Sequence, residues 1–160
     1  MDVFIADIKY LGTYKKFLLE CFNHGLEKYE SALDDPKSYL QSLLVDSHLT
    51  STYFCVQNDE ILGAIRYRHH TNTYIKNVIG HVGYETKPTA RGKGVAKFML
   101  SWIQKHVLTD TIISTCEIDN IASKKIIERC GAKYLNQIYS PEKNSEIKRF
   151  QLEPVFPPKN

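Results

Sequence analysis

The amino-acid sequence predicts a mixed α/β domain in which helices pack on a central sheet. The spacing of apolar residues changes from helical to strand-like and back along the 160 residues, with no internal repeat and no linker. Hydrophobic residues make up 42% and charged residues 24%, which is enough to bury a core and argues against intrinsic disorder. We therefore expect one domain over residues 1–153 and an irregular tail over 154–160.

The first part of the chain predicts a strand near residues 3–8 followed by two helices. Apolar residues recur at helical spacing from Leu11 to Phe22, and His24-Gly25 ends this helix. Asp35-Pro36 begins the second helix, with an N-cap followed by proline at the first helical position.

The middle of the chain has the period of strands. Strands over residues 52–56 and 61–67 flank the turn residues Asn58-Asp59 and predict a hairpin. A polar stretch then leads to a further strand, Val78 to Thr86, which stops at Lys87-Pro88.

The last part alternates helices and strands. Residues 89–96 open a helix whose apolar face has the spacing i, i+3, i+4, i+7, i+8. A strand over 111–116 precedes another helix, which Asp119-Asn120 caps and Gly131 closes. Two strands complete the chain, residues 133–139 and 147–152.

The glycine-rich turn Arg91-Gly92-Lys93-Gly94 carries the strongest chemical signal. The free N–H groups of a helix's first turn attract anions, and glycines let a ligand approach the backbone. The turn is not a P-loop, because Gly94 follows Lys93 where serine or threonine is required. It is not a dinucleotide fingerprint either, because Lys97 stands where the last glycine is required. This chemistry favours the hypothesis that the turn binds a phosphate-type ligand over the hypothesis that the two glycines only begin a helix.

These residues carry a resemblance to a known family. Residues 91–96 resemble the acyl-CoA pyrophosphate loop of the GNAT superfamily of N-acetyltransferases, whose pattern is Gln/Arg-x-x-Gly-x-Gly/Ala. Asn120-Ile121-Ala122-Ser123 resemble the family's second cofactor segment, and the element order is similar to the GNAT fold over essentially the whole chain. Residues 68–72, 80–84 and 139–144 resemble a bacterial subgroup of predicted acetyltransferases.

The resemblance implies a mostly antiparallel sheet that splays between its fourth and fifth strands. It also implies acetyl-CoA as co-substrate, with the pantetheine arm in the splay, the pyrophosphate on the loop N–H groups and an oxyanion donor at the end of the splayed strand. The cofactor residues so implied are Tyr84, Glu85, Thr86, Arg91, Gly92, Lys93, Gly94, Val95, Ala96, Asn120 and Ser123.

The implied reaction is direct attack of a primary amine on acetyl-CoA in a ternary complex, which requires a base and an acid. Glu117 and His81 are the candidate bases, with Glu85 a third option whose neighbours direct it to the opposite face. The tyrosine that often serves as the acid would fall at Ile127. Tyr139 is therefore the candidate acid, or the thiolate leaves unassisted. Each of these residues also has a non-catalytic interpretation. Glu117 would be a solvated loop acid, His81 a hydrogen-bonded core histidine and Tyr139 a tyrosine of an amphipathic strand.

Other function classes are less favoured by the sequence. The alternative is a non-catalytic acyl-CoA-binding sensor, which Ile127 motivates. A nucleic-acid-binding domain would need a denser cationic stripe than a net charge of +3 provides. His69, His70 and His81 lack metal-ligand spacing, so we expect no metal. The cysteines are expected to be reduced core thiols, and they are Cys21, Cys55, Cys116 and Cys130.

The expected location is cytoplasmic. The opening residues lack a basic start and a cleavage site, and the apolar runs are too short to cross a bilayer. The amine acceptor, a small molecule or a protein amine, is not identified by the sequence. Acidic residues between positions 27 and 35 are consistent with a cationic amine. Pairing of two copies through the C-terminal strands is a common arrangement in the resembled family.

Overall fold

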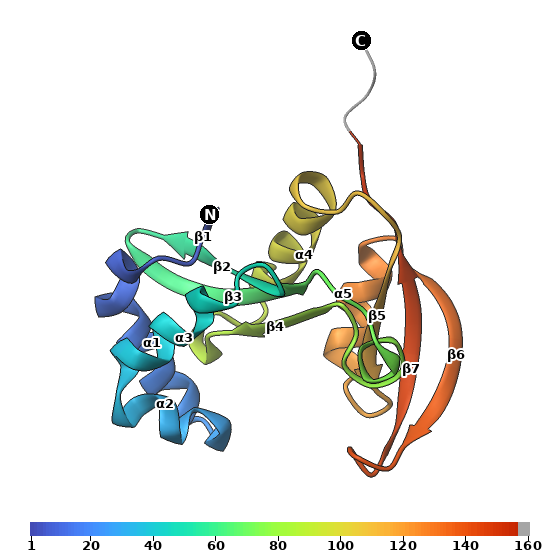
Figure 1. Ribbon diagram of the computed structural model, residues 1–160, viewed down its shortest axis with the longest axis horizontal. Coiled ribbons are helices and arrows are strands. Elements are labelled where there is room, and N and C mark those ends of the chain that lie inside the picture. Colours follow the sequence, from blue (N-terminus) through green and yellow to red (C-terminus); the bar gives the residue numbers. More distant parts are fainter. Residues whose placement is uncertain (157–160) are drawn as a thin grey trace. The chain divides into compact units, whose positions relative to one another are not determined.

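Two separate sheets organise the computed structural model, which describes residues 1–156 (Figure 1). The first sheet has the strand order β1-β2-β3-β4 and the second has the order β5-β7-β6, so β4 and β5 belong to different sheets. The strand pairs β1–β2, β2–β3, β5–β7 and β6–β7 are antiparallel. The predicted mixed α/β class with mostly antiparallel strands is therefore confirmed, but the strands form two sheets where one central sheet was predicted.

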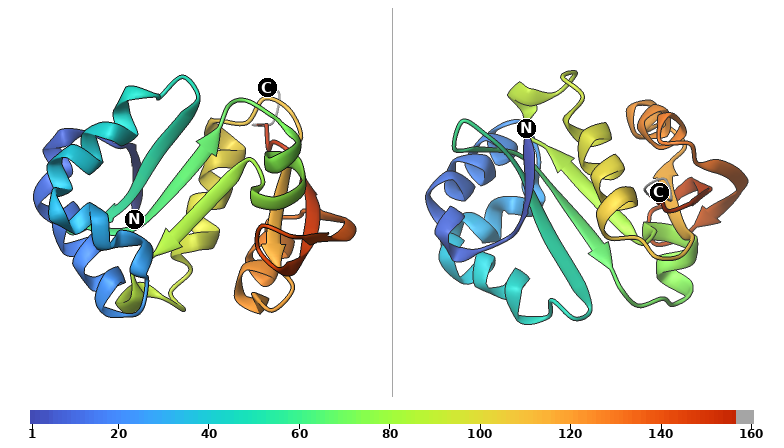
Figure 2. Two further views of the ribbon diagram at one scale, coloured as in Figure 1. Left: turned by 60° about the horizontal axis from the view of Figure 1, so that its bottom comes forward. Right: turned by 90° about the horizontal axis from the view of Figure 1, so that it is seen from above.

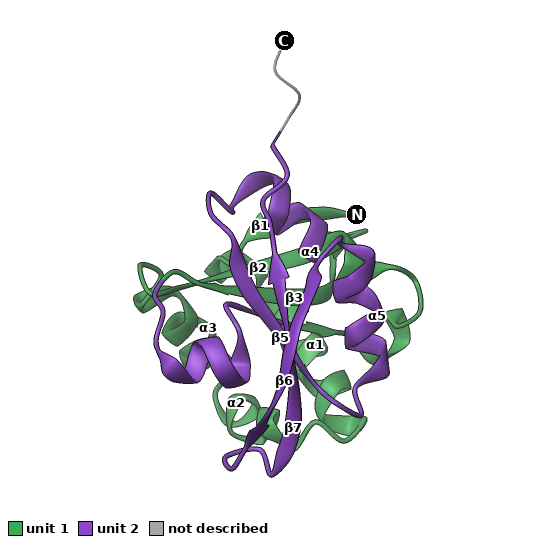
Figure 3. Ribbon diagram, turned by 90° about the vertical axis from the view of Figure 1, so that its right-hand side faces the viewer, with its two compact units in different colours: residues 1–69, 84–99 green, residues 70–83, 100–160 purple. Residues whose placement is uncertain are grey.

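The chain forms two compact units (Figure 3). Unit 1 comprises residues 1–69 and 84–99, and unit 2 comprises residues 70–83 and the chain from residue 100 onward. The extent of the predicted domain, residues 1–153, stays a prediction.

Unit 1 contains most of the first sheet, the helices between its first two strands and a short turn after its last strand. Its helices and turns are η1 (Ile8–Tyr10), α1 (Leu11–Asn23), η2 (Glu27–Tyr29), α2 (Glu30–Asp34), α3 (Pro36–Val45) and η4 (Pro88–Ala90). Its strands are β1 (Asp2–Ile5), β2 (Thr50–Gln57), β3 (Glu60–Arg68) and most of β4 (Val82–Thr86). The helix α4 (Val95–His106) begins in unit 1.

The predicted helix boundaries in unit 1 are confirmed. Asp35 accepts a hydrogen bond from the Ser38 N–H and Pro36 is the first residue of α3, as an N-cap followed by proline requires. The helix α1 ends at Asn23 before Gly25. The sequence did not predict η2 and α2, because these pieces are too short to show helical periodicity.

One face of the first sheet packs against α1 to α3 (Figure 2, left, blue and cyan). The buried cluster between them includes Tyr14, Leu18, Leu40 and Phe54. The opposite face packs against α4, because an ideal Cβ built on Gly63 of β3 would lie only 2.8 Å from the Met99 side chain. The sheet is thus covered on both faces within unit 1.

The predicted strand Val78 to Thr86 is wrong over its first half. Residues Ile75–Ile79 form a single helical turn, η3, and β4 begins only at Val82. The Asn72 side chain accepts a hydrogen bond from the Ile75 N–H (2.8 Å) and starts the turn, and Gly80 ends it with φ +69°. The β-branched residues of this segment indicate a strand, but this local capping overrides them.

Unit 2 contains the second sheet. Its elements are η3, β5 (Ile112–Glu117), α5 (Ile121–Arg129), β6 (Lys133–Ser140) and β7 (Ser145–Leu152), together with the second half of α4. Apart from η3, these elements match the predicted order. Residues 153–156 have no regular structure, whereas Pro157 and Pro158 of the predicted tail lie outside the described residues. Within residues 1–156, no helix is both long enough and apolar enough to span a membrane.

Gly80 makes a close backbone contact that should be measurable in stability. A Cβ at this position would lie 3.1 Å from both Ile113 O and Thr115 N on β5. We expect Gly80→Ala to lower the free energy of unfolding by about 2–4 kcal/mol in urea titration, from overpacking and backbone strain together. Gly131→Ala is the matched control, since Gly131 has φ +83° but nothing within 4 Å of its ideal Cβ. Equal losses in the two variants would contradict the contact argument.

Candidate functional site

The glycine-rich turn has the conformation that anion binding requires. Gly92 and Gly94 have φ angles of +75° and +79°, and a Cβ built on either residue would meet no atom within 4 Å. Residues 91–94 are exposed and lead directly into α4, whose first N–H groups have no partner within the helix. The Arg91 N–H is itself engaged, since it donates to Pro88 O at 3.2 Å. The open cradle therefore consists of the N–H groups that follow Arg91.

The turn is tied to the rest of unit 1 at three points. The Lys87 N–H donates to Leu62 O on β3 (2.8 Å). The Thr89 hydroxyl donates to Glu20 Oε1 on α1 (2.9 Å), and the Thr89 N–H lies 3.4 Å from Glu20 Oε2. Arg91 Nη2 lies 3.9 Å from Glu85 Oε2 on β4. These contacts fix the turn before α4 begins.

Glu85 lies between two cations on the α1 side of the sheet. Its Oε1 is 3.0 Å from Lys28 Nζ, and its side chain is 20% exposed. Burial raises the pKa of the neighbouring Cys21 thiol to about 12, with the charges of Glu85 and Glu20 adding to the shift. Cys21 is therefore a protonated core thiol rather than a nucleophile.

The predicted core location holds for three of the four cysteines. Cys21, Cys55 and Cys116 are buried, whereas Cys130 is only partly buried, and its Sγ lies 3.6 Å from Ser101 Oγ. Within residues 1–156, no group of three His, Cys, Asp or Glu side chains could hold a metal ion.

In unit 2, the predicted second cofactor segment opens α5. Asn120 caps the helix, because its Oδ1 accepts a hydrogen bond from the Ser123 N–H (3.1 Å). This leaves the Asn120 amide NH₂ as a donor for a ligand. Ile127 on the same helix is completely buried, so no polar group replaces the missing tyrosine at that position.

His81 precedes β4 instead of lying in the predicted strand, and it forms two hydrogen bonds with Ile113 of β5. Its N–H donates to Ile113 O (2.8 Å), and its Nδ1 accepts from the Ile113 N–H (3.1 Å). Its Nε2 lies 3.2 Å from Thr71 Oγ1. Both ring nitrogens of His81 are therefore engaged within unit 2.

Glu117 and Tyr139 do not lie next to each other. Glu117 is the half-buried last residue of β5, opposite Ile147, and no described residue forms an ion pair with it. Tyr139 lies on β6, opposite Glu146, and its hydroxyl donates to Asn144 Oδ1 (2.7 Å). Since β7 lies between β5 and β6, the two strands are about 10 Å apart. The structure instead brings Glu117 close to Asn120, whose N–H donates to Glu117 O (2.9 Å).

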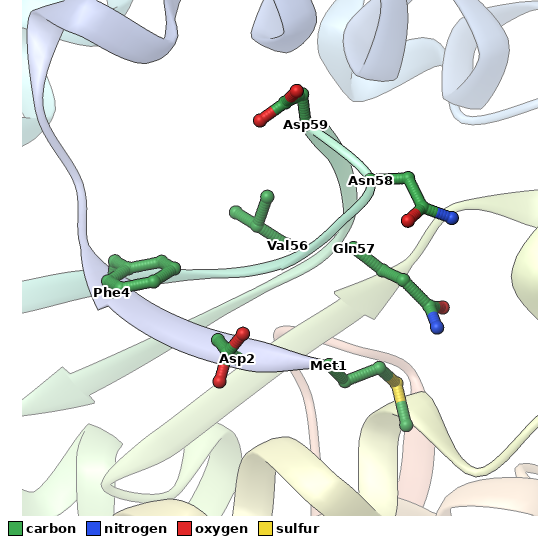
Figure 4. Close-up of a pocket in the computed structure, with 7 residues that line it drawn as sticks. All are labelled: Met1, Asp2, Phe4, Val56, Gln57, Asn58 and Asp59. Atoms are coloured by element: carbon green, nitrogen blue, oxygen red, sulfur yellow. The ribbon is translucent and has the colours of Figure 1, made fainter.

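Two residues that support the turn had no signal in the sequence. Glu20 and Lys28 are ordinary surface-type residues of α1 and η2, and only folding brings them to Thr89 and Glu85. A hollow elsewhere in unit 1, between β1 and the β2–β3 turn, contains none of the predicted site residues (Figure 4). Its lining consists of Met1, Asp2, Phe4, Val56, Gln57, Asn58 and Asp59.

Comparison with known proteins adds to this geometry. A family model described as an acetyltransferase (GNAT) domain matches residues 20–133, which include α1, the glycine-rich turn and α5. Among curated protein sequences, none matches the chain significantly.

Solved structures share the architecture. RimL, a ribosomal L7/L12 alpha-N-protein acetyltransferase in complex with coenzyme A, aligns with a TM-score of 0.72 and 12% identity over 95% of this chain and 93% of its own. The microcin C7 self-immunity acetyltransferase MccE, in complex with acetyl-CoA and AMP, aligns with a TM-score of 0.74 and 14% identity over 94% of this chain and 91% of its own. The ribosomal-protein-S5-alanine acetyltransferase from Vibrio fischeri aligns with a TM-score of 0.67 and 18% identity over 93% of this chain and 90% of its own. At these identities the similarity is one of fold.

Proposed function

The chain belongs to the GNAT family of acetyl-CoA-dependent N-acetyltransferases, and from this premise we propose that it acetylates a primary amine by direct attack on acetyl-CoA. The observation that carries the proposal is the turn at Gly92 and Gly94, where two left-handed glycines with open Cβ positions lead into α4. Because glycine has no side chain, the space beside the turn stays open, and a pyrophosphate could approach the backbone N–H groups there.

The proposed cofactor contacts follow from this cradle. The N–H groups after Arg91 bind the pyrophosphate, and the backbone of Tyr84 to Thr86 pairs with the pantetheine arm. The Asn120 amide donates to the arm, with Ser123 in the first turn of the same helix. The Glu20–Thr89 and Glu85–Arg91 contacts hold the turn in place before the cofactor arrives.

The proposed chemistry joins the amine nitrogen to the acetyl carbon and breaks the carbon–sulfur bond. Glu117 takes the proton from the acceptor ammonium, because its carboxylate has no ion-pair partner among the described residues. His81 is the weaker candidate, since its Nδ1 already accepts from Ile113. The thiolate is protonated by Tyr139 or leaves unassisted. The buried Ile127 excludes that position as the acid.

The acceptor is the finer part of the proposal. RimL and the Vibrio fischeri protein are acetyltransferases of ribosomal proteins, and these names support an amine of a protein. An amine of a small molecule is the other acceptor class that the sequence leaves open. A cytoplasmic location, a bacterial source and a homodimer stay predictions of the sequence.

The experiment is a calorimetric titration with acetyl-CoA together with a thiol-release assay over a mixed amine panel. Binding with thiol release is the expected result. Binding without release on any amine would favour the non-catalytic acyl-CoA sensor, which the missing tyrosine at Ile127 motivates. Absence of binding at millimolar acetyl-CoA would refute the proposed function.

The Glu20–Thr89 contact gives a prediction for cofactor affinity. We expect Glu20→Ala to weaken acetyl-CoA binding about 5- to 10-fold, because it removes the acceptor that fixes Thr89. Glu20→Gln should lose less, since the amide oxygen still accepts from Thr89 and a negative charge near the pyrophosphate is removed. Calorimetry measures both, with Glu27→Ala as the control on the same side of unit 1. An unchanged affinity in Glu20→Ala would show that the contact does not position the turn.

A further inference from the structure

Arg66 lies on the face of the first sheet that α1 to α3 cover. It is directly opposite Thr52 in the β2–β3 register, so the two side chains project from the same face. Phe54, two residues from Thr52 and hence on this face, packs against Tyr14 of α1 with ring centroids 5.0 Å apart. Arg66 is half-buried there.

The guanidinium of Arg66 has no acidic partner among the residues that the structure describes. Within residues 1–156, the ion pairs of unit 1 join Glu85 to Lys28 and Arg91, and Glu60 to Lys87, and none includes Arg66. A charge withdrawn from water normally has a partner, because its burial is otherwise costly. Arginine offers a planar fork of donors that matches a carboxylate. A carboxylate of a bound ligand could therefore serve as the ion-pair partner of Arg66.

Three hydroxyl groups on the α1 to α3 side of the sheet make no hydrogen bond to any described residue. Thr52 Oγ1 is fully buried and has no hydrogen-bond partner within residues 1–156. The hydroxyls of Tyr14 and Tyr29 make no hydrogen bond to any described residue, although the side chains are only 3% and 7% exposed. Burial raises the pKa of both hydroxyls, and the charge of Arg66 opposes the shift. Thr52 and Tyr14 thus lie on the same covered face of the sheet as Arg66.

A negative group lies on the same face. The Lys87 N–H donates to Leu62 O, and the ideal Cβ of Gly63 is 3.1 Å from Glu85 O, so Ala64 of β3 lies beside Glu85. Arg66 is two residues further along that face, which makes it a diagonal cross-strand neighbour of Glu85, about 7–8 Å away. Glu85 already holds an ammonium, since Lys28 Nζ lies 3.0 Å from it. The face therefore offers a carboxylate that can hold an ammonium beside an arginine without a partner.

We propose that Arg66, with the hydroxyls of Tyr14 and Tyr29, binds a carboxylate of the acceptor, so that the acceptor is an amino acid or another amine that carries a carboxylate. This inference rests on the proposed function, because it names the substrate class of that transferase. The carboxylate replaces the missing ion-pair partner of Arg66 and accepts from the hydroxyl groups, and the free amine remains available for acetylation.

The test compares matched acceptors in the thiol-release assay. Each amino acid is paired with its amide and its decarboxylated amine, and the enzymes are wild type, Arg66→Gln and Arg66→Lys. We expect kcat/KM for the acids to exceed that for the amides about 10- to 100-fold, and Arg66→Gln to lose this preference. Arg66→Lys should restore part of it, because lysine keeps the charge without the fork. Lys15→Gln, which removes an exposed charge of α1, is the control and should change nothing.

The outcomes separate this inference from the proposed function. Equal rates for acids and amides, or an Arg66→Gln enzyme that keeps the preference, would overturn the carboxylate site while the transferase stands. The acetyl-CoA affinity of Arg66→Gln must match the wild type, which shows that the variant is folded. If no acceptor is acetylated, titration of the CoA-saturated protein with amino acids decides the site. Binding that Arg66→Gln loses would support it, and absence of binding would overturn it.

Discussion

Gly94→Val is expected to weaken acetyl-CoA binding at least about 100-fold, a loss of ~2.7 kcal/mol. Two causes act together. The φ of +79° at Gly94 is strained for a β-branched residue, so the turn shifts, and the new side chain projects into the open space in which we propose that the pyrophosphate binds. Calorimetric titration with acetyl-CoA measures the loss.

The control for this variant is Gly25→Val, at the end of α1. Gly25 also has a positive φ, +95°, and its ideal Cβ also meets nothing within 4 Å. Both variants should therefore lose about 1–3 kcal/mol of stability from backbone strain. Only Gly94→Val should lose the cofactor. Wild-type affinity in Gly94→Val would show that the turn is purely structural.

Glu117→Gln is expected to lower kcat about 100- to 10,000-fold, the range typical of removing a general base. Its KM for acetyl-CoA should stay within about twofold of the wild type, since the side chain is assigned to proton transfer and not to binding. Steady-state kinetics with an acceptor identified in the amine panel measures both constants.

Two further variants complete this experiment, a control at Glu128 and a variant of the competing candidate base, His81. Glu128→Gln removes a carboxylate of α5 that pairs with Lys124, so its kcat should be unchanged. His81→Phe removes the acceptor of the Ile113 N–H, so it should lower the urea midpoint of unfolding. A near-wild-type kcat in Glu117→Gln, with a collapse of kcat in a folded His81→Phe enzyme, would reverse the assignment of the base.

Elements with a local signal could be predicted from the sequence. The α3 start at Asp35-Pro36, the Asn58-Asp59 hairpin turn and the Asn120 cap of α5 are confirmed, because each depends on neighbouring residues alone. The prediction failed at Val78 and Ile79, where strand propensity lost to a turn that Asn72 starts. Short pieces such as η2 and α2 give too few residues for a period to appear.

The family and the glycine-rich turn could be predicted from the amino-acid sequence alone, because the glycines at 92 and 94 act through their own backbone angles. The contacts around that turn depend instead on the tertiary structure. Glu20 reaches Thr89 across 69 positions of the chain, and Arg66 acquires its face and its partnerless state from strand register. Such contacts depend on long-range pairing, which no local spacing encodes, and a one-residue slip of β3 would send Arg66 to the opposite face.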